Sequence, residues 1–201
     1  MTAGPDYRVA PWVSIAMLLS LGASSHALAQ DAPTTAPITF ERAGIAAGAS
    51  VGYGVIGFRG PNPVRQKSGV FMGWLGWCFA DRVVAGAEVE AAGPWDAGFD
   101  HRVFMAAVQY WLAPRVWVRG GLGVGVFGII DGDGGRAEQI DRGTAYSATL
   151  GFETARFGQS KPWTADVQVR FAQSKLEAIH LRPHNVSVQV GVAWYTLRPR
   201  K

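Results

Sequence analysis

Apolar and polar residues alternate along eight separate stretches of the chain, and the links between these stretches fall into two length classes. Alternation with a period of two predicts β-strands that have one apolar and one polar face. The eight stretches are residues 44–58, 69–79, 83–91, 103–112, 116–130, 144–156, 163–173 and 186–197. The short links are 80–82, 113–115 and 157–162, and the long links, of 10 to 13 residues, are 59–68, 92–102, 131–143 and 174–185. Short turns at one end and long loops at the other are typical of an up-and-down barrel in an outer membrane.

The composition of the polar faces favours a membrane barrel over a soluble one. The polar faces of the last three stretches are rich in Gly, Ser, Thr, Gln and Ala, whereas a water-facing surface would carry many lysines and glutamates. Every lysine lies in a link or in the C-terminal tail, and a lysine that faces lipid near the midplane costs about 2–4 kcal/mol. The sequence therefore predicts an all-β fold, an eight-stranded antiparallel up-and-down transmembrane β-barrel.

Aromatic residues gather near the strand ends on the side of the short links. Rings with a polar edge settle at the membrane interface, so this set predicts a girdle facing the periplasm. Its members are Trp77, Trp111, Trp117, Trp163 and Trp194, with Phe79, Tyr110, Phe157 and Tyr195 beside them. A sparser outer girdle is predicted from Phe58, Phe71, Phe104 and Tyr146.

The first 29 residues have the pattern of a secretory signal peptide. Residues 13–23 form an apolar run that is too short for a membrane-spanning helix, which needs about 20 apolar residues. Ala27-Leu28-Ala29 fits an A-x-A cleavage site, so we expect the mature chain to begin at Gln30. The predicted segments are the signal peptide (1–29), a periplasmic N-terminal segment (30–43), the outer-membrane barrel (44–197) and a basic tail (198–201).

Charge and cysteine content narrow the classes of function. Charged residues make up 17% of the chain, the net charge is +4, and no strand-like stretch carries a basic stripe, which argues against nucleic acid as a partner. Cys78 is the only cysteine, so no disulfide can form within the chain.

The chain resembles the small eight-stranded outer-membrane barrels, similar to the barrel domain of outer membrane protein A and to outer membrane proteins X and W. The resemblance covers about residues 44–197 and rests on the architecture and on the closing pattern Val186-Ser-Val-Gln-Val-Gly-Val-Ala-Trp-Tyr195. It implies a place in the Gram-negative cell envelope, with outer-membrane lipids including lipopolysaccharide and the barrel-assembly machinery as partners. One departure is the C-terminus, where residues 196–201 follow the aromatic pair instead of ending on it.

A polar cluster is predicted inside the barrel, because eight strands enclose a space just wide enough for side chains to fill. Glu153 and Asp166 lie symmetrically about the 157–162 turn, so they should be neighbours, and Arg119 is the expected cation between them. We favour a structural plug, and a gate or proton-linked site is the alternative. The predicted inward side chains are Glu88, Glu90, Gln109, Arg119, Glu153, Asp166, Gln168 and Arg170.

Two opposite strands present glycine to the interior. These glycines leave a narrow water-filled passage, or they make room for larger inward groups such as Met72 and Trp74. The sequence does not choose between the two outcomes. The glycines are Gly48, Gly52 and Gly54 on the first strand and Gly121, Gly123 and Gly125 on the fifth.

Three sequence motifs resemble binding or catalytic sites, and in each case a purely structural interpretation is favoured. The G-x-G-x-x-G match at residues 123–128 continues as a strand, whereas a dinucleotide site needs a helix at that point. His184 and Ser187 are three apart on a strand and therefore point to opposite faces. An acidic loop lacks the spacing of a calcium-binding EF-hand, so a solvated loop is favoured. Its residues are Asp131, Asp133, Glu138 and Asp141.

We therefore predict no catalytic residue, no metal and no cofactor. The expected function is that of a non-enzymatic outer-membrane barrel with a structural or surface-interaction role through its long extracellular loops. A narrow channel for small solutes is the first alternative, and a lipid A-modifying enzyme is the second.

Overall fold

The computed structural model describes residues 40–59, 64–94, 98–129, 138–156, 162–177 and 182–199. The predicted signal peptide and its cleavage site, and residues 131–137 of the acidic loop, lie outside these described residues. Within the described ranges there is no helix long and apolar enough to cross a membrane.

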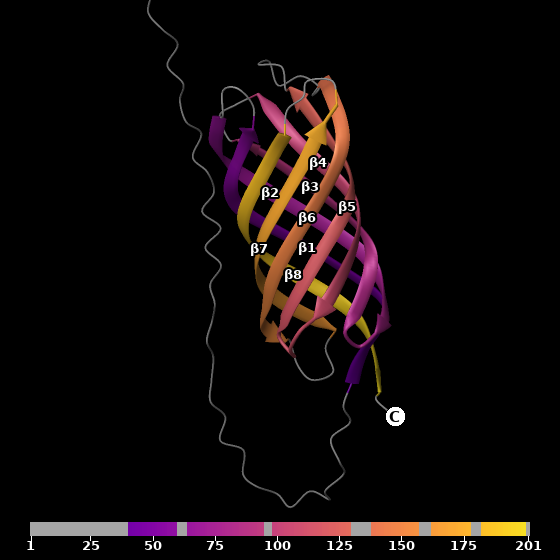
Figure 1. The fold of residues 1–201 in the computed structure, drawn as a ribbon. Helices are drawn as coiled ribbons and strands as arrows, with labels where there is room; N and C mark the ends of the chain where they lie inside the picture. Colours follow the sequence, from indigo (N-terminus) through magenta and orange to yellow (C-terminus); the bar gives the residue numbers. More distant parts are fainter. Residues whose placement is uncertain are drawn as a thin grey trace, which may run out of the picture. The chain divides into compact units, whose positions relative to one another are not determined.

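Eight strands form one closed sheet in which each strand pairs antiparallel with its neighbours in the chain and β1 pairs with β8 (Figure 1). This arrangement confirms the predicted all-β, eight-stranded antiparallel up-and-down barrel. The strands are β1 (Phe40–Arg59), β2 (Val64–Ala80), β3 (Val83–Pro94), β4 (Phe99–Trp111), β5 (Val116–Ile129), β6 (Glu138–Arg156), β7 (Trp163–Leu176) and β8 (Arg182–Pro199).

The first strand begins before the predicted start of the barrel. Phe40 already pairs with Pro199, and the pairing then shifts register between Arg42 and Ala46. Gly44, with φ of 65°, lies within this bulge. The extra residues interrupt the two-residue alternation, so residues 40–43 look like a lead-in although they belong to β1. Residues 198 and 199 of the predicted tail likewise belong to β8.

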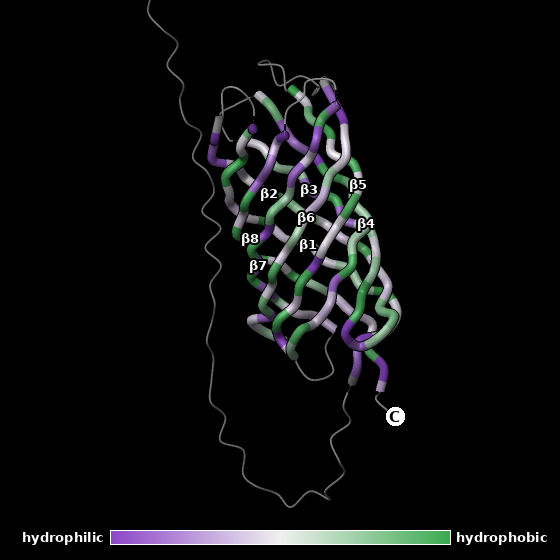
Figure 2. Tube along the Cα trace, viewed as in Figure 1, coloured by the Kyte–Doolittle hydropathy of each residue, from purple (hydrophilic) through white to green (hydrophobic). Residues whose placement is uncertain are grey.

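The apolar faces of the strands point outward. On β8, Val188 and Val190 are 56% and 57% exposed, whereas the alternating Gln189 is 1% exposed. Figure 2 shows hydrophobic residues recurring along the strands, with hydrophilic segments toward both ends of the barrel. An apolar exterior around a polar interior is the arrangement that lipid requires and that water disfavours.

The predicted aromatic girdle is correct only for part of its members. Trp77 and Trp163 are about half exposed and face outward, as predicted. Trp111, Trp117 and Tyr195 are buried inside the barrel, because they lie on the same strand faces as Gln109, Arg119 and Gln189. In the predicted outer girdle, Phe58 also points inward, where its ring contacts the rings of Phe99 and Phe127.

Candidate functional site: the charged lumen

The central layer of the lumen is a buried cation held by two carboxylates from the opposite wall. Arg170 on β7 has no exposed surface, and its Nη2 donates to Oε1 of Glu88 at 2.7 Å. Its Nε donates to Oε2 of Glu90, and its Nη1 donates to Thr149 at 2.9 Å. β3 and β7 lie four strands apart in the ring of eight. The ion pairs therefore tie opposite walls together across the lumen.

Side chains from two further strands complete the hydrogen bonding of this layer. Ser147 on β6 donates to Oε1 of Glu88 at 2.9 Å, and Asn185 on β8 donates to Oε1 of Glu90 at 3.3 Å. Both donors are buried. Buried carboxylates are stable only where cations and hydrogen-bond donors satisfy them, and here they receive both.

Arg119 lies next to this layer, between two indole rings. Its guanidinium carbon is 4.5 Å from the ring centroid of Trp74 and 4.9 Å from that of Trp117. Its Nε donates to Oε1 of Gln109 at 3.0 Å, and its Nη1 lies 3.7 Å from Oε2 of Glu88. Its described contacts thus join it to Glu88, not to the predicted Glu153. Gln109 is its cross-strand partner on β4, which explains why the side chain is held on that side.

Arg42 is the cation that pairs with Glu153. Its Nη2 lies 2.5 Å from Oε1 of Glu153, which also accepts a hydrogen bond from Trp111 Nε1 at 2.8 Å. The guanidinium lies 4.1 Å from the Trp111 ring centroid and 5.1 Å from that of Tyr195. Glu153 and Asp166 are cross-strand partners, as the turn symmetry predicted. The sequence missed Arg42 because the bulge at Gly44 hides its inward face.

The long-loop end of the lumen contains a cluster of aromatic rings and a buried histidine–serine pair. The rings of Phe58, Phe99 and Phe127 contact one another with centroids 5.2–5.6 Å apart. His101 Nε2 and Ser174 Oγ lie 2.7 Å apart, and both side chains are buried. The sequence offered no signal for this pair, because β4 and β7 are not neighbours in the sheet.

Inward glycines make room for large side chains in this lumen. A Cβ at Gly48 would come within 2.5 Å of Trp74 Nε1, and a Cβ at Gly121 would come within 2.9 Å of Glu88 Oε1. The space next to each of these two glycines is therefore occupied by a side chain. At these positions the structure favours filling of the interior over an open passage.

The candidate catalytic pair does not meet. His184 faces outward and is half-buried, whereas Ser187 faces the lumen and accepts a hydrogen bond from Gln189 at 2.9 Å. Among the described residues, no group of His, Cys, Asp and Glu could hold a metal ion. In the acidic loop, Asp141 is buried, and the side chains of the other three predicted residues lie outside the described part of the chain.

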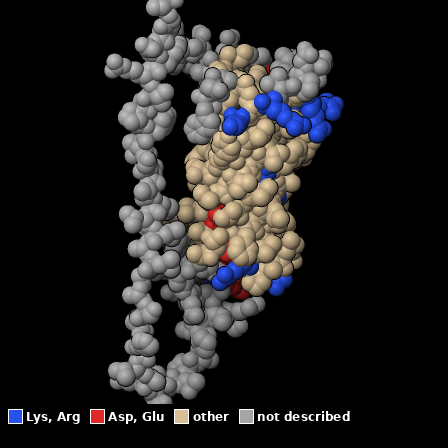
Figure 3. All heavy atoms as spheres, turned by 90° about the vertical axis from the view of Figure 1, so that its left-hand side faces the viewer, with Lys and Arg blue, Asp and Glu red and all other residues tan. Residues whose placement is uncertain are grey.

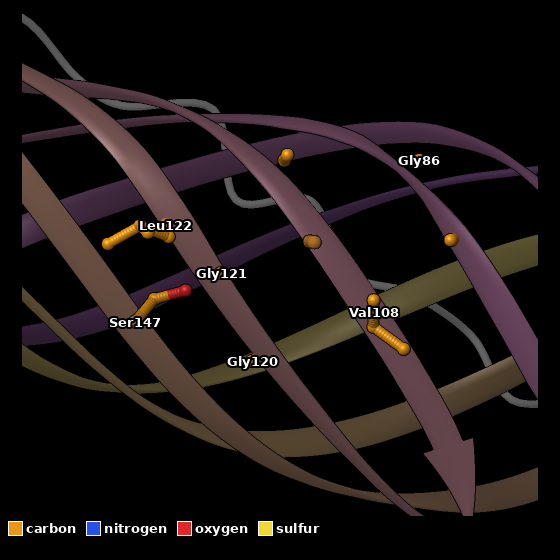
Figure 4. Close-up of a pocket in the computed structure, with 9 residues that line it drawn as sticks. Gly86, Val108, Gly120, Gly121, Leu122 and Ser147 are labelled. Carbon is orange, nitrogen blue, oxygen red and sulfur yellow. The ribbon is translucent and has the colours of Figure 1, made fainter.

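The outer wall has an open depression of about 490 Å³ over β3, β4 and β5. Val108 and Leu122 line it together with small residues such as Gly86 and Gly120, and Figure 4 shows these residues on neighbouring strands. Ser147 is the one polar side chain among its lining residues, and that hydroxyl donates to Glu88 inside the barrel. The depression thus presents an apolar surface on the outside of the barrel.

Comparison with known proteins shows the class of fold. No family model matches the chain, and no curated protein matches it in sequence. The solved structure of Ail, the attachment invasion locus protein of Yersinia pestis, is similar with a TM-score of 0.52 and 16% identity, over 76% of this chain and 99% of that one. Ail in complex with the heparin analogue sucrose octasulfate gives a TM-score of 0.51 at 14% identity, over 76% of this chain and 99% of that one.

Neisserial surface protein A is similar with a TM-score of 0.53 and 10% identity, over 75% of this chain and 99% of that one. Identities this low establish shared fold alone. The chain is an eight-stranded β-barrel that resembles Gram-negative outer-membrane proteins, and the predicted resemblance to the small members of that class is confirmed at the level of fold.

Proposed function

We propose that the protein is a non-enzymatic outer-membrane barrel with a structural or surface-interaction role, exerted through its long extracellular loops. The observation that carries this proposal is the tie across the lumen between Arg170 and the carboxylates of Glu88 and Glu90. An aromatic layer lies on each side of it, around Arg42 at the short-turn end and around Phe58 at the other. A filled interior leaves the ends of the barrel as the surfaces that can meet partners.

Within the described residues, the hydroxyl that lies within hydrogen-bond distance of a histidine ring is out of reach of substrate. Ser174 is the hydroxyl that lies beside a histidine, and neither it nor His101 is more than 1% exposed. A nucleophile and its base must contact the substrate as well as each other. Lipid A modification therefore remains the least supported alternative.

A narrow conduit is the second candidate function, and one observation favours it. Three buried oxygens, Oε2 of Glu88, Oδ1 of Asp166 and Oε1 of Gln168, have no hydrogen-bond partner within the described part of the chain. Such atoms are common sites of ordered water, which would form part of a path for small solutes.

Conductance in planar bilayers separates the two candidates. We expect the wild-type barrel to give no discrete current steps, because side chains occupy the central layer. The variant Arg170→Ala with Glu88→Ala and Glu90→Ala serves as the sensitivity control, since it removes the tie and should raise the current above that of the wild type. Reproducible steps from the wild type would contradict the plug and favour the conduit. A mass change in lipid A on overexpression would instead support the enzyme.

The proposed location in the outer membrane can be tested by fractionation and by gel mobility. The mature chain should begin at Gln30, fractionate with the outer membrane after recognition by the barrel-assembly machinery, and migrate differently on gels before and after boiling. A closed barrel resists unfolding by detergent until it is heated, which is the reason for the two mobilities. N-terminal sequencing and fractionation measure the first two points. Recovery of the folded chain in the soluble periplasm would contradict the proposal.

A further inference from the structure

The long-loop end of three adjacent strands carries a patch of four outward cations. We call Arg59 on β1, Arg65 and Lys67 on β2, and Arg182 on β8 the basic patch, and all four residues are exposed. Figure 3 shows Lys and Arg side chains gathered near this end of the barrel, with a largely uncharged surface below them.

The register of the sheet places the patch directly beyond the lipid-facing surface. Val51 on β1 pairs with Val190 and Phe71, which are all exposed and apolar. Four residues further along β1, Val55 pairs with Lys67 on one side and with Val186 on the other. The cations thus begin where the apolar rows end, at the level of lipid headgroups.

Arg59 and Arg182 are direct cross-strand partners. Like charges directly opposite each other on an antiparallel pair of strands are destabilising. An anion bound between or above the two guanidinium groups would offset their repulsion. Within the described residues, no carboxylate forms a salt bridge with either side chain, nor with Arg65 or Lys67.

Two other exposed cations of the barrel pair with carboxylates of the chain. Arg102, at the same end, pairs with Asp100 at 2.5 Å. Arg198, at the short-turn end, pairs with Glu41. The basic patch is distinguished by the direct pairing of Arg59 with Arg182, without a carboxylate partner within the described residues. A pair of arginines suits the planar recognition of phosphate oxygens.

We propose that the basic patch binds the phosphate groups of a phosphorylated glycolipid in the outer leaflet of the membrane. The proposal rests on the proposed function, since it needs the barrel to span an outer membrane with its long loops outside. Acyl chains would lie along the valine rows of β8 and β1, and the headgroup phosphates would lie against the arginines above them. The patch thereby anchors the barrel to the lipid that surrounds it.

The test compares a bisphosphorylated lipid A with its dephosphorylated form, each added to the full-length mature barrel in neutral detergent micelles, by native mass spectrometry. The double variant Arg59→Gln with Arg182→Gln should bind the phosphorylated lipid about thirtyfold more weakly, since each cation near a membrane surface contributes about 1 kcal/mol and 1.4 kcal/mol is tenfold. The matched control Arg82→Gln with Arg115→Gln removes two exposed cations from the short-turn end and should bind like the wild type.

Heat-dependent gel migration shows that each variant is folded before its binding is measured. The loss should also shrink as salt rises, because exposed charge interactions are screened. Equal binding of the two lipids by the wild type, or an equal loss in both double variants, would overturn the proposal. Free inositol hexakisphosphate can also be added at the concentration at which lipid A binds. If it inhibits the binding of lipid A at that concentration, the patch is a site for a soluble anion and the proposal is overturned. None of these outcomes depends on conductance, so failure here leaves the proposed function standing.

Discussion

Replacing Arg170 with methionine is expected to destabilise the barrel by about 3–5 kcal/mol, because removal of one partner leaves uncompensated buried charge. Glu88 and Glu90 would then lie side by side on β3 without the cation that donates to both. Arg170 has no exposed surface, so water cannot replace it without repacking the layer. Urea unfolding of the barrel in lipid vesicles, followed by tryptophan fluorescence, measures the loss.

Two further variants show that the loss comes from unpaired charge. The triple change Arg170→Met, Glu88→Gln and Glu90→Gln removes all three charges and should recover much of the lost stability, since replacing a whole buried ionic group is often neutral. Arg102→Met breaks an exposed ion pair and should cost at most about 1 kcal/mol. Losses that simply add across the three lumen sites would show that these residues do not act as a unit.

The faces of the strands could be predicted from the sequence because they depend on a single local rule. A two-residue period separates inward from outward side chains wherever the strand is regular, so Glu88, Glu90 and Arg170 were placed inside correctly. The same rule places Trp111 and Trp117 inside, where they are buried, whereas their position near the strand ends alone suggests an outward girdle. Whether the lumen cluster is a plug or a gate stays a prediction.

The partners within the lumen could not be predicted, because they depend on geometry across the barrel. Arg170 reaches β3 from β7, and nothing in the spacing of the sequence shows that these strands face each other at the same depth. Arg42 was missed for a local reason, since a bulge breaks the alternation that would have revealed its inward face. The predicted pairing of Arg119 with Glu153 is wrong for both reasons. Arg119 contacts Glu88 on another strand, and the bulge hides Arg42, which is the actual partner of Glu153.

The low sequence identity between this chain and the similar structures follows from the same difference between a local alternation rule and contacts across the barrel. Ail and Neisserial surface protein A share 10–16% of residues with this chain, and they nevertheless align over at least 75% of it. A barrel needs alternating polarity, strands of matching length and turns, and many sequences satisfy these conditions. The lumen contacts that satisfy each buried charge are particular to the chain, so function cannot be transferred with the fold.

Replacing Val190 with arginine is expected to reduce stability in a bilayer by about 2–4 kcal/mol, because a lipid-facing cation near the midplane is poorly solvated. Val190 is 57% exposed and lies in an apolar row, with Val167 as its partner on β7 and Val51 on β1. Neither neighbour can pair with the introduced charge. Reversible urea unfolding in vesicles reports the change, and Val124→Arg on β5 should give a similar loss at a second site.

The neighbouring lumen position provides the matched control. Gln189 is 1% exposed and is hydrogen-bonded to Ser50 and Ser187, so Gln189→Asn shortens a side chain but introduces no charge. Its cost should be about 1 kcal/mol, the value of a typical hydrogen bond. In detergent micelles, where water and headgroups approach the barrel wall more closely, the penalty for Val190→Arg should shrink while that for Gln189→Asn stays the same. A harmless Val190→Arg in vesicles would mean that this face of β8 does not meet lipid.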